Sequence, residues 1–193
     1  MLHPVPKQAY LAELQARIEQ NRWMVETVFM PLDQEARSRQ PAPDEWSVDQ
    51  CFQHLIVAFE GLSPNFIPAL DKPESADSGG IFRPSFWPRR LNSIMFDPQK
   101  KFPTSKRYNP AETSEKTFYC NVLDQSLTRL DQLSKIVERA AQADLQTKCW
   151  FLFLRYNLGD ILNYLVSHDE LHIGQARRAL ETYKQEKKAT NDG

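Results

Sequence analysis

Three of the four histidines in this 193-residue chain have positions suited to binding a metal ion. His168 and His172 lie four residues apart. In a helix this spacing puts two side chains about 40° apart around the axis and about 6 Å apart along it, so both imidazoles can reach one point. Two neutral imidazoles at this separation provide half of a divalent metal site. The rest of the chain must supply the other ligands.

His54 is the candidate for a third ligand. It lies in a second helical pattern, on a stripe that includes Gln50 and Cys51. Three nitrogen ligands leave a position open for water or substrate, as in catalytic rather than structural zinc sites. A plainer interpretation stays open: His54 is a buried, hydrogen-bonded side chain, and the His168/His172 pair is a solvated polar seam. All three fall on faces expected to point inward, so a shared metal site and the plainer interpretation both stay open on these residues alone.

Four neighbouring positions are candidates for lining a pocket beside the histidines. Cys51 lies one turn before His54, where a thiolate ligand would close the site and favour a structural metal; the alternative is a small buried side chain. Gln175 follows His172 by three residues and could hydrogen-bond a metal-bound water. Tyr164 precedes His168 by one turn, and Gln50 precedes His54 by one turn. Each of these side chains also fits ordinary packing or polar surface.

The segment from His168 to His172 nearly spells the H-E-x-x-H motif of zinc proteases. In that motif the residue after the first histidine is the glutamate that acts as general base. This chain has Asp169 at that position, one methylene shorter, and Glu170 points elsewhere on a helix. We therefore expect Asp169 and Glu170 to be solvated or paired with arginines, and we reject a metalloprotease.

The hydrophobic pattern predicts an all-α fold of four long helices, with no strand of clear period-two alternation. Leu11, Leu14 and Ile18 repeat at helical spacing in the first helix. Ser47 and Gln50 form a capping-box pattern at the start of the second. The expected helices cover residues 7–30, 47–62, 111–141 or 114–141, and 160–188.

Residues 71–110 form a long connection between the second and third predicted helices. They contain six prolines and a local charge excess of +4, from eight basic and four acidic residues. Their aromatic and aliphatic content is too high for a disordered linker. We predict a packed crossover that covers one end or flank of the helices, with a short helix near 85–96.

Composition limits the classes of protein and partner. The chain is 41% hydrophobic and 25% charged, which suits one domain over residues 1–193. A net charge of −1 gives no reason to expect nucleic acid or an anionic membrane as partner. The three cysteines lack a CxxC motif and cannot all pair, which favours a reducing cytoplasm. No signal peptide and no apolar run long enough to span a bilayer are recognised.

Several short motifs together resemble the DinB-like superfamily. They are Trp46-Ser47, His54-Leu55, the segment 157–162 and the pattern His168-x-x-x-His172-x-x-Gln175. The resemblance covers nearly the whole chain in order and spacing. It implies an up-down-down-up four-helix bundle with a long crossover between helices two and three. It also implies a divalent metal on His54, His168 and His172, and homodimers are common among the relatives.

The resemblance and the histidines lead to one principal functional hypothesis. The chain is expected to be a divalent-metal-dependent enzyme, using zinc or nickel, that acts on a small molecule such as a low-molecular-weight thiol. Relatives include thiol S-transferases that use bacillithiol and mycothiol-dependent maleylpyruvate isomerase-like proteins, so thiol S-transfer or hydrolysis is expected. The alternative is a non-catalytic, metal-stabilised dimeric bundle that acts as a stress-related or interaction protein.

Overall fold

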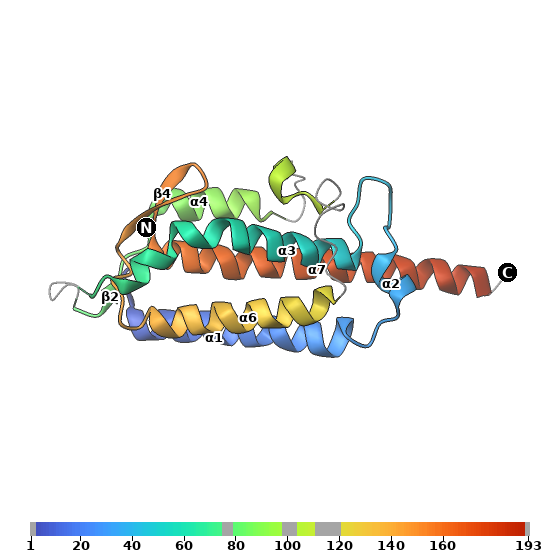
Figure 1. Cartoon of the computed structure of the whole chain (residues 1–193), viewed down its shortest axis with the longest axis horizontal. Helices are drawn as coiled ribbons and strands as arrows, with labels where there is room; N and C mark the ends of the chain where they lie inside the picture. The colour runs from blue at the N-terminus through green and yellow to red at the C-terminus, as the bar shows by residue number, and fades with distance from the viewer. Residues whose placement is uncertain (1–2, 75–78, 98–103, 111–120, 192–193) are drawn as a thin grey trace.

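A computed structural model describes residues 3–74, 79–97, 104–110 and 121–191 of the chain. The described part is mostly helical, with two small antiparallel sheets (Figure 1). Its four longest helices are α1 (Lys7–Met24), α3 (Val48–Leu62), α6 (Val122–Arg139) and α7 (Leu158–Asn191).

These four helices lie side by side and enclose the core. Helix α3 packs against α6 and α7, and α1 packs against the same two helices. In Figure 1, α1 and α7 run from left to right, whereas α3 and α6 run from right to left. Each helix buries apolar side chains in one contiguous cluster, including Leu14 of α1, Leu55 of α3, Leu133 of α6 and Ile161 of α7. Within a helix the buried residues recur at helical spacing, as Leu11, Leu14 and Ile18 do in α1, so one face turns inward.

The helix that carries His54 begins with the predicted capping box. The Gln50 backbone N–H donates to Ser47 Oγ at 3.3 Å, and the Ser47 backbone N–H donates to Gln50 Oε1 at 2.9 Å. These bonds satisfy two amides that lack partners in the first turn of a helix. The cap fixes where α3 starts, and it therefore fixes where His54 lies two turns later.

The predicted helix boundaries differ from the structure at several ends; the fourth predicted helix, 160–188, is α7 at Leu158–Asn191, and α6 ends at Arg139 rather than at 141. Helix α1 changes after Met24 into a π-helical turn, Val25–Phe29, so the predicted span 7–30 is helical but not uniform. The third predicted helix is α6, and its expected start at 111 or 114 lies outside the described residues.

The prediction of no strands was wrong. Strands β1 (Val5–Pro6) and β2 (Ile81–Phe82) pair, and β3 (Lys148–Phe151) forms a hairpin with β4 (Leu154–Asn157). Side chains alternate between exposed and buried along β3, but its aromatic run hides that period in the sequence. A strand of two residues is too short to show any period.

Shorter elements complete the described part. Helix α2 (Gln34–Ser38) precedes α3, and helix α4 (Phe86–Met95) agrees with the short helix predicted inside the crossover. Three 3-10 turns cover Ser63–Asn65, Ile67–Asp71 and Lys106–Tyr108. Among the described helices, none combines the length and the hydropathy that a membrane crossing requires.

Candidate metal centre

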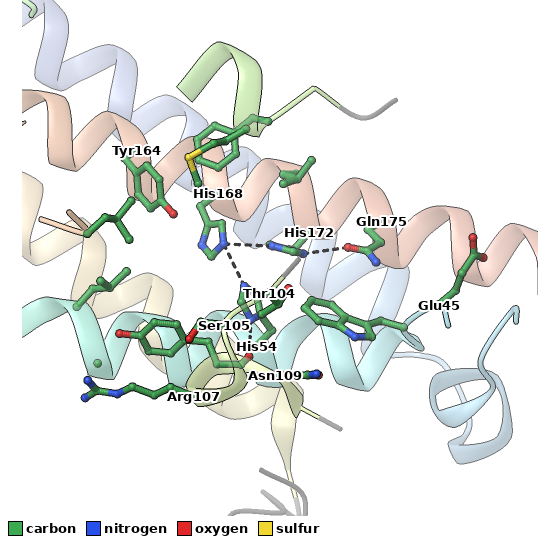
Figure 2. Close-up of a pocket in the computed structure, with 18 of the residues that line it drawn as sticks. Glu45, His54, Thr104, Ser105, Arg107, Asn109, Tyr164, His168, His172 and Gln175 are labelled. Atoms are coloured by element: carbon green, nitrogen blue, oxygen red, sulfur yellow. Dashed lines mark hydrogen bonds between the residues drawn. The ribbon is translucent and has the colours of Figure 1, made fainter. Parts of the chain in front are cut away.

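The three predicted histidines come together between two neighbouring helices. His54 projects from α3, and His168 and His172 project from adjacent turns of α7 (Figure 2). His168 Nε2 lies 3.1 Å from His54 Nε2 and 3.2 Å from His172 Nε2. One ligand nitrogen from each ring lies within 4.8 Å of the others. The three nitrogens can therefore reach one ion.

Hydrogen bonds on the far sides of two rings fix which nitrogen carries the proton. His54 Nδ1 donates to the Tyr108 carbonyl at 2.7 Å, and His172 Nδ1 donates to Gln175 Oε1 at 3.0 Å. In a neutral imidazole the other nitrogen, Nε2, then carries a lone pair. Both of these lone pairs face His168 Nε2.

This arrangement fits a cation better than it fits hydrogen bonding among the rings. A single proton on His168 Nε2 can serve only one of its two neighbours, and it leaves the other lone pair facing a nitrogen. A divalent cation accepts all three lone pairs, and the two outer hydrogen bonds match the usual support of metal-ligating histidines. The residues present therefore fit a bound metal.

Burial keeps these histidines in the neutral form that binds metals. The three rings are only 6%, 9% and 8% exposed for His54, His168 and His172. Loss of solvation, with a smaller contribution from the Arg129 charge, lowers the pKa of His54 to about 4 against the opposing effect of the hydrogen bond to the Tyr108 carbonyl. The pKa values of His168 and His172 also fall well below the usual range, first through burial and then through the neighbouring rings. No proton must leave these nitrogens at neutral pH before a metal binds.

Aromatic rings hold the three imidazoles from outside. The Trp46 ring lies 4.9 Å from the His54 ring and stacks on His172 at 5.6 Å. Tyr164 stacks on His168 at 5.5 Å, and Phe96 lies 6.0 Å from the same ring. These contacts limit rotation of the imidazoles, and the same three aromatic side chains also line the cavity beside them.

A large cavity opens next to the histidine cluster. Its volume is about 1270 Å³, and all three histidines line it. Figure 2 shows polar side chains around the cluster from several segments of the chain. The polar lining includes Glu45, Thr104, Ser105, Arg107, Asn109 and Arg178; the apolar lining includes Met95, Phe96, Leu152 and Phe153. A metal ion held by the three nitrogens would therefore face this space, where a substrate can enter.

The acidic residues between His168 and His172 are engaged elsewhere. Asp169 forms a buried ion pair with Arg129, with an N–O distance of 2.9 Å. Glu170 forms an ion pair with Arg17 at 2.7 Å. Neither carboxylate belongs to the histidine cluster, as expected when the zinc-protease motif was rejected.

The other four predicted pocket residues divide into two pairs. Tyr164 and Gln175 line the cavity. Gln50 and Cys51 are not among the described residues that line it. Gln50 is used in the capping box of α3, and Cys51 is fully buried in the core, where burial raises the pKa of its thiol. Cys51 is therefore an apolar packing residue here rather than a fourth ligand.

Sequence reasoning missed three groups that surround the histidines. Trp46 was used only to identify the family, although a tryptophan just before a helix cap signals a packed helix entry. Phe96 was expected only to pack in the crossover. The Tyr108 carbonyl had no signal at all, because every residue type offers a backbone carbonyl and His54 is 54 positions away.

Comparison with known proteins supports the resemblance. The family model of the DinB superfamily matches residues 17–176, which contain all three histidines and most of the described helices. A search of curated proteins and a search of solved structures each found no significant match.

Proposed function

The chain belongs to the DinB superfamily, and from this premise we propose that it is a divalent-metal-dependent enzyme with His54, His168 and His172 as its ligands. One observation carries the proposal: three Nε2 atoms with neutral, buried rings converge at the wall of a large cavity. Three protein ligands leave a coordination position for water or substrate. Zinc and nickel are the proposed metals, because imidazole ligands suit both and both rank high among divalent ions in affinity for nitrogen sites.

We propose thiol S-transfer or hydrolysis of a small molecule as the reaction class. When bound, such a cation lowers the pKa of a coordinated thiol or water, which supplies a nucleophile near neutral pH. The chain's own groups prepare the site. The Tyr108 carbonyl orients the His54 ring and Gln175 orients the His172 ring, while Trp46 stacks on His172 and Tyr164 stacks on His168. Arg107 and Arg178 in the cavity lining supply positive charge for an anionic part of the substrate.

The site is tested by metal analysis of single alanine variants. Protein purified from zinc- or nickel-supplemented cells is expected to carry one metal ion per chain, measured by elemental analysis. His54→Ala, His168→Ala and His172→Ala should each lose most of it, because two imidazoles hold an ion far less tightly than three. His3→Ala, in the exposed N-terminal segment, is the matched control. Wild-type metal content in all three variants would contradict the proposal.

The reaction class is tested separately with the thiol probe monochlorobimane. Metal-loaded wild type should accelerate its conjugation to a low-molecular-weight thiol. Chelation should remove that activity, and the metal should restore it. His168→Ala should lack the activity even when metal is added. Binding of metal without any thiol or hydrolytic activity would reject this part while leaving the metal site intact.

A second candidate is a non-catalytic, metal-stabilised dimer. The close aromatic packing around the imidazoles favours this alternative, because it also suits a site that only holds helices α3 and α7 together. Metal removal would then lower the melting temperature without changing any activity.

We also propose that the four long helices form the up-down-down-up bundle that the resemblance implies, in one domain over 1–193 that pairs as a homodimer. Sedimentation analysis tests the dimer.

A further inference from the structure

A second cavity lies between helices α1, α4 and α7. Its volume is about 630 Å³, and none of the three histidines lines it. Phe96, Leu171 and Arg178 line both cavities, so the two are neighbours separated in part by these side chains. A volume of this size accommodates a small organic molecule.

Hydrogen bonds within the protein fix one wall of this cavity. The Arg17 guanidinium donates to both carboxylate oxygens of Glu170 at 2.7 Å, to Asn163 Oδ1 at 3.0 Å and to Ser167 Oγ at 2.8 Å. The Tyr10 hydroxyl donates to the Gly159 carbonyl at 2.9 Å. These groups of α1 and α7 are already paired, so this wall is held in place before any ligand enters.

Helix α4 contributes buried polar atoms without partners to the lining. Asn92 of α4 is only 5% exposed, and neither its amide nitrogen nor its amide oxygen has a hydrogen-bond partner in the described part of the chain. The buried Nε of Arg89, also in the lining, has none either. An unpaired buried polar group destabilises a protein by its full desolvation cost. Three such atoms in two neighbouring lining residues point to a ligand that supplies their partners.

The charges in the lining define the chemistry of that ligand. Arg89, which lies near the Asp160 carboxylate, and Arg178 provide positive charge. Glu13 lies near the Arg17 guanidinium but forms no ion pair with it among the described residues. We propose that this cavity binds a small zwitterion, an amino acid or short peptide that carries one carboxylate and one ammonium group. Arg89 holds the carboxylate through charge-assisted hydrogen bonds, and Glu13 faces the ammonium group. The Asn92 amide can both donate to and accept from the ligand.

Simpler ions suit the lining less well. A plain carboxylate would bring no cation to Glu13, and a plain amine would bring no anion to Arg89 and Arg178. A zwitterion satisfies both signs at once. The site is distinct from the proposed metal centre and does not require it.

Titration calorimetry with L-serine and glycylglycine tests the proposal, with acetate and ethylamine as the corresponding half-ligands. At least one zwitterion should bind wild type, and both half-ligands should bind at least tenfold more weakly. Arg89→Met and Asn92→Leu should each weaken zwitterion binding by about ten- to a hundredfold, the loss expected for a hydrogen bond to a charged group. Arg90→Met is the matched control, because Arg90 is the exposed neighbour of Arg89 and does not line the cavity.

Several results would overturn the proposal. They are absence of binding of both zwitterions at millimolar concentration, equal binding of acetate, and binding that neither variant changes. The first would mean that the cavity holds water only. His168→Ala should retain zwitterion binding in metal-free protein, so failure of the metal proposal and failure of this one are distinguishable. If Asn92→Leu does not fold, Arg89→Met still decides the outcome.

Discussion

The orientation of a single ring, that of His54, depends on a glycine two turns further along α3. Gly61 lies against the side chain of Tyr108, the residue whose carbonyl accepts the proton of His54 Nδ1. A Cβ placed on Gly61 would lie 2.6 Å from Tyr108 Cε1, closer than side chains tolerate. The absence of a side chain at position 61 therefore lets the segment around Tyr108 approach the histidine cluster.

We predict that Gly61→Ala destabilises the protein by about 1–3 kcal/mol, as overpacking does elsewhere. The variant should also shift the His54 tautomer, because Tyr108 must move away from the ring. Urea unfolding measures the first effect, and nitrogen-15 chemical shifts of the imidazoles in metal-free protein measure the second.

Gly174→Ala is the matched control for that substitution. Its added Cβ would have only Arg178 Nη1 nearby, at 3.7 Å, so the variant should gain up to about 1 kcal/mol from helix propensity. A Gly61→Ala protein with wild-type stability and an unchanged His54 tautomer would show that Tyr108 does not depend on this position.

At the scale of elements, a buried ion pair connects α6 to α7 behind the histidines. The side chains of Arg129 and Asp169 are 5% and 2% exposed, and Arg129 also lies over the Phe59 ring of α3. Taking two charges out of water costs nearly as much as their attraction returns. The pair as a whole therefore contributes little net stability. Removal of one member alone is costly, because the charge of the other member is then buried without a partner.

We predict that Asp169→Leu alone destabilises the protein by about 3–5 kcal/mol, because it leaves the Arg129 charge buried and unpaired. The double variant Arg129→Met/Asp169→Leu should recover most of that loss. A double-mutant cycle in urea measures the coupling.

The exposed pair Arg177–Glu181 on α7 provides the comparison. Its side chains are 61% and 56% exposed, so Glu181→Gln should change stability by less than about 0.5 kcal/mol. If the effects of the single substitutions at 129 and 169 simply add, the two side chains are not energetically coupled.

For the whole molecule, placing three neutral histidines in the core makes stability depend on pH. Burial lowers the pKa of all three below the unfolded value of about 6.5, and that of His54 falls to about 4. Between these values the unfolded chain binds protons that the folded chain does not. Acidification therefore begins to lower the free energy of unfolding below about pH 6.5, and the loss grows as the pH falls toward 4.

We predict that metal-free wild type loses stability on acidification by up to about 1.4 kcal/mol per pH unit for each buried histidine. His54→Gln should show a shallower slope than wild type. Urea unfolding in the presence of a chelator, repeated from about pH 7 to about pH 4, measures both slopes. His3→Gln serves as the control with an unchanged slope. Parallel curves for wild type and His54→Gln would contradict the burial effect on this residue.

The sequence by itself determined the helices and the three histidines. Helical periodicity is a local property, so the spacing of Leu14 and Ile18, the capping box at Ser47 and the four-residue step from His168 to His172 could be read directly. The family resemblance then connected His54 to the other two. Neither the two small sheets nor the position of Cys51 in the core followed from that local pattern.

Only the tertiary structure decided what surrounds these residues. The Tyr108 carbonyl reaches His54 across 54 positions, and Arg129 reaches Asp169 across 40. The unpaired Asn92 amide and the second cavity lie where α4, α1 and α7 meet, whereas the cavity beside the histidines lies between α3, α7 and the segment around Tyr108. Contacts of this kind depend on how separate segments pack, and packing leaves no repeating pattern in the order of residues.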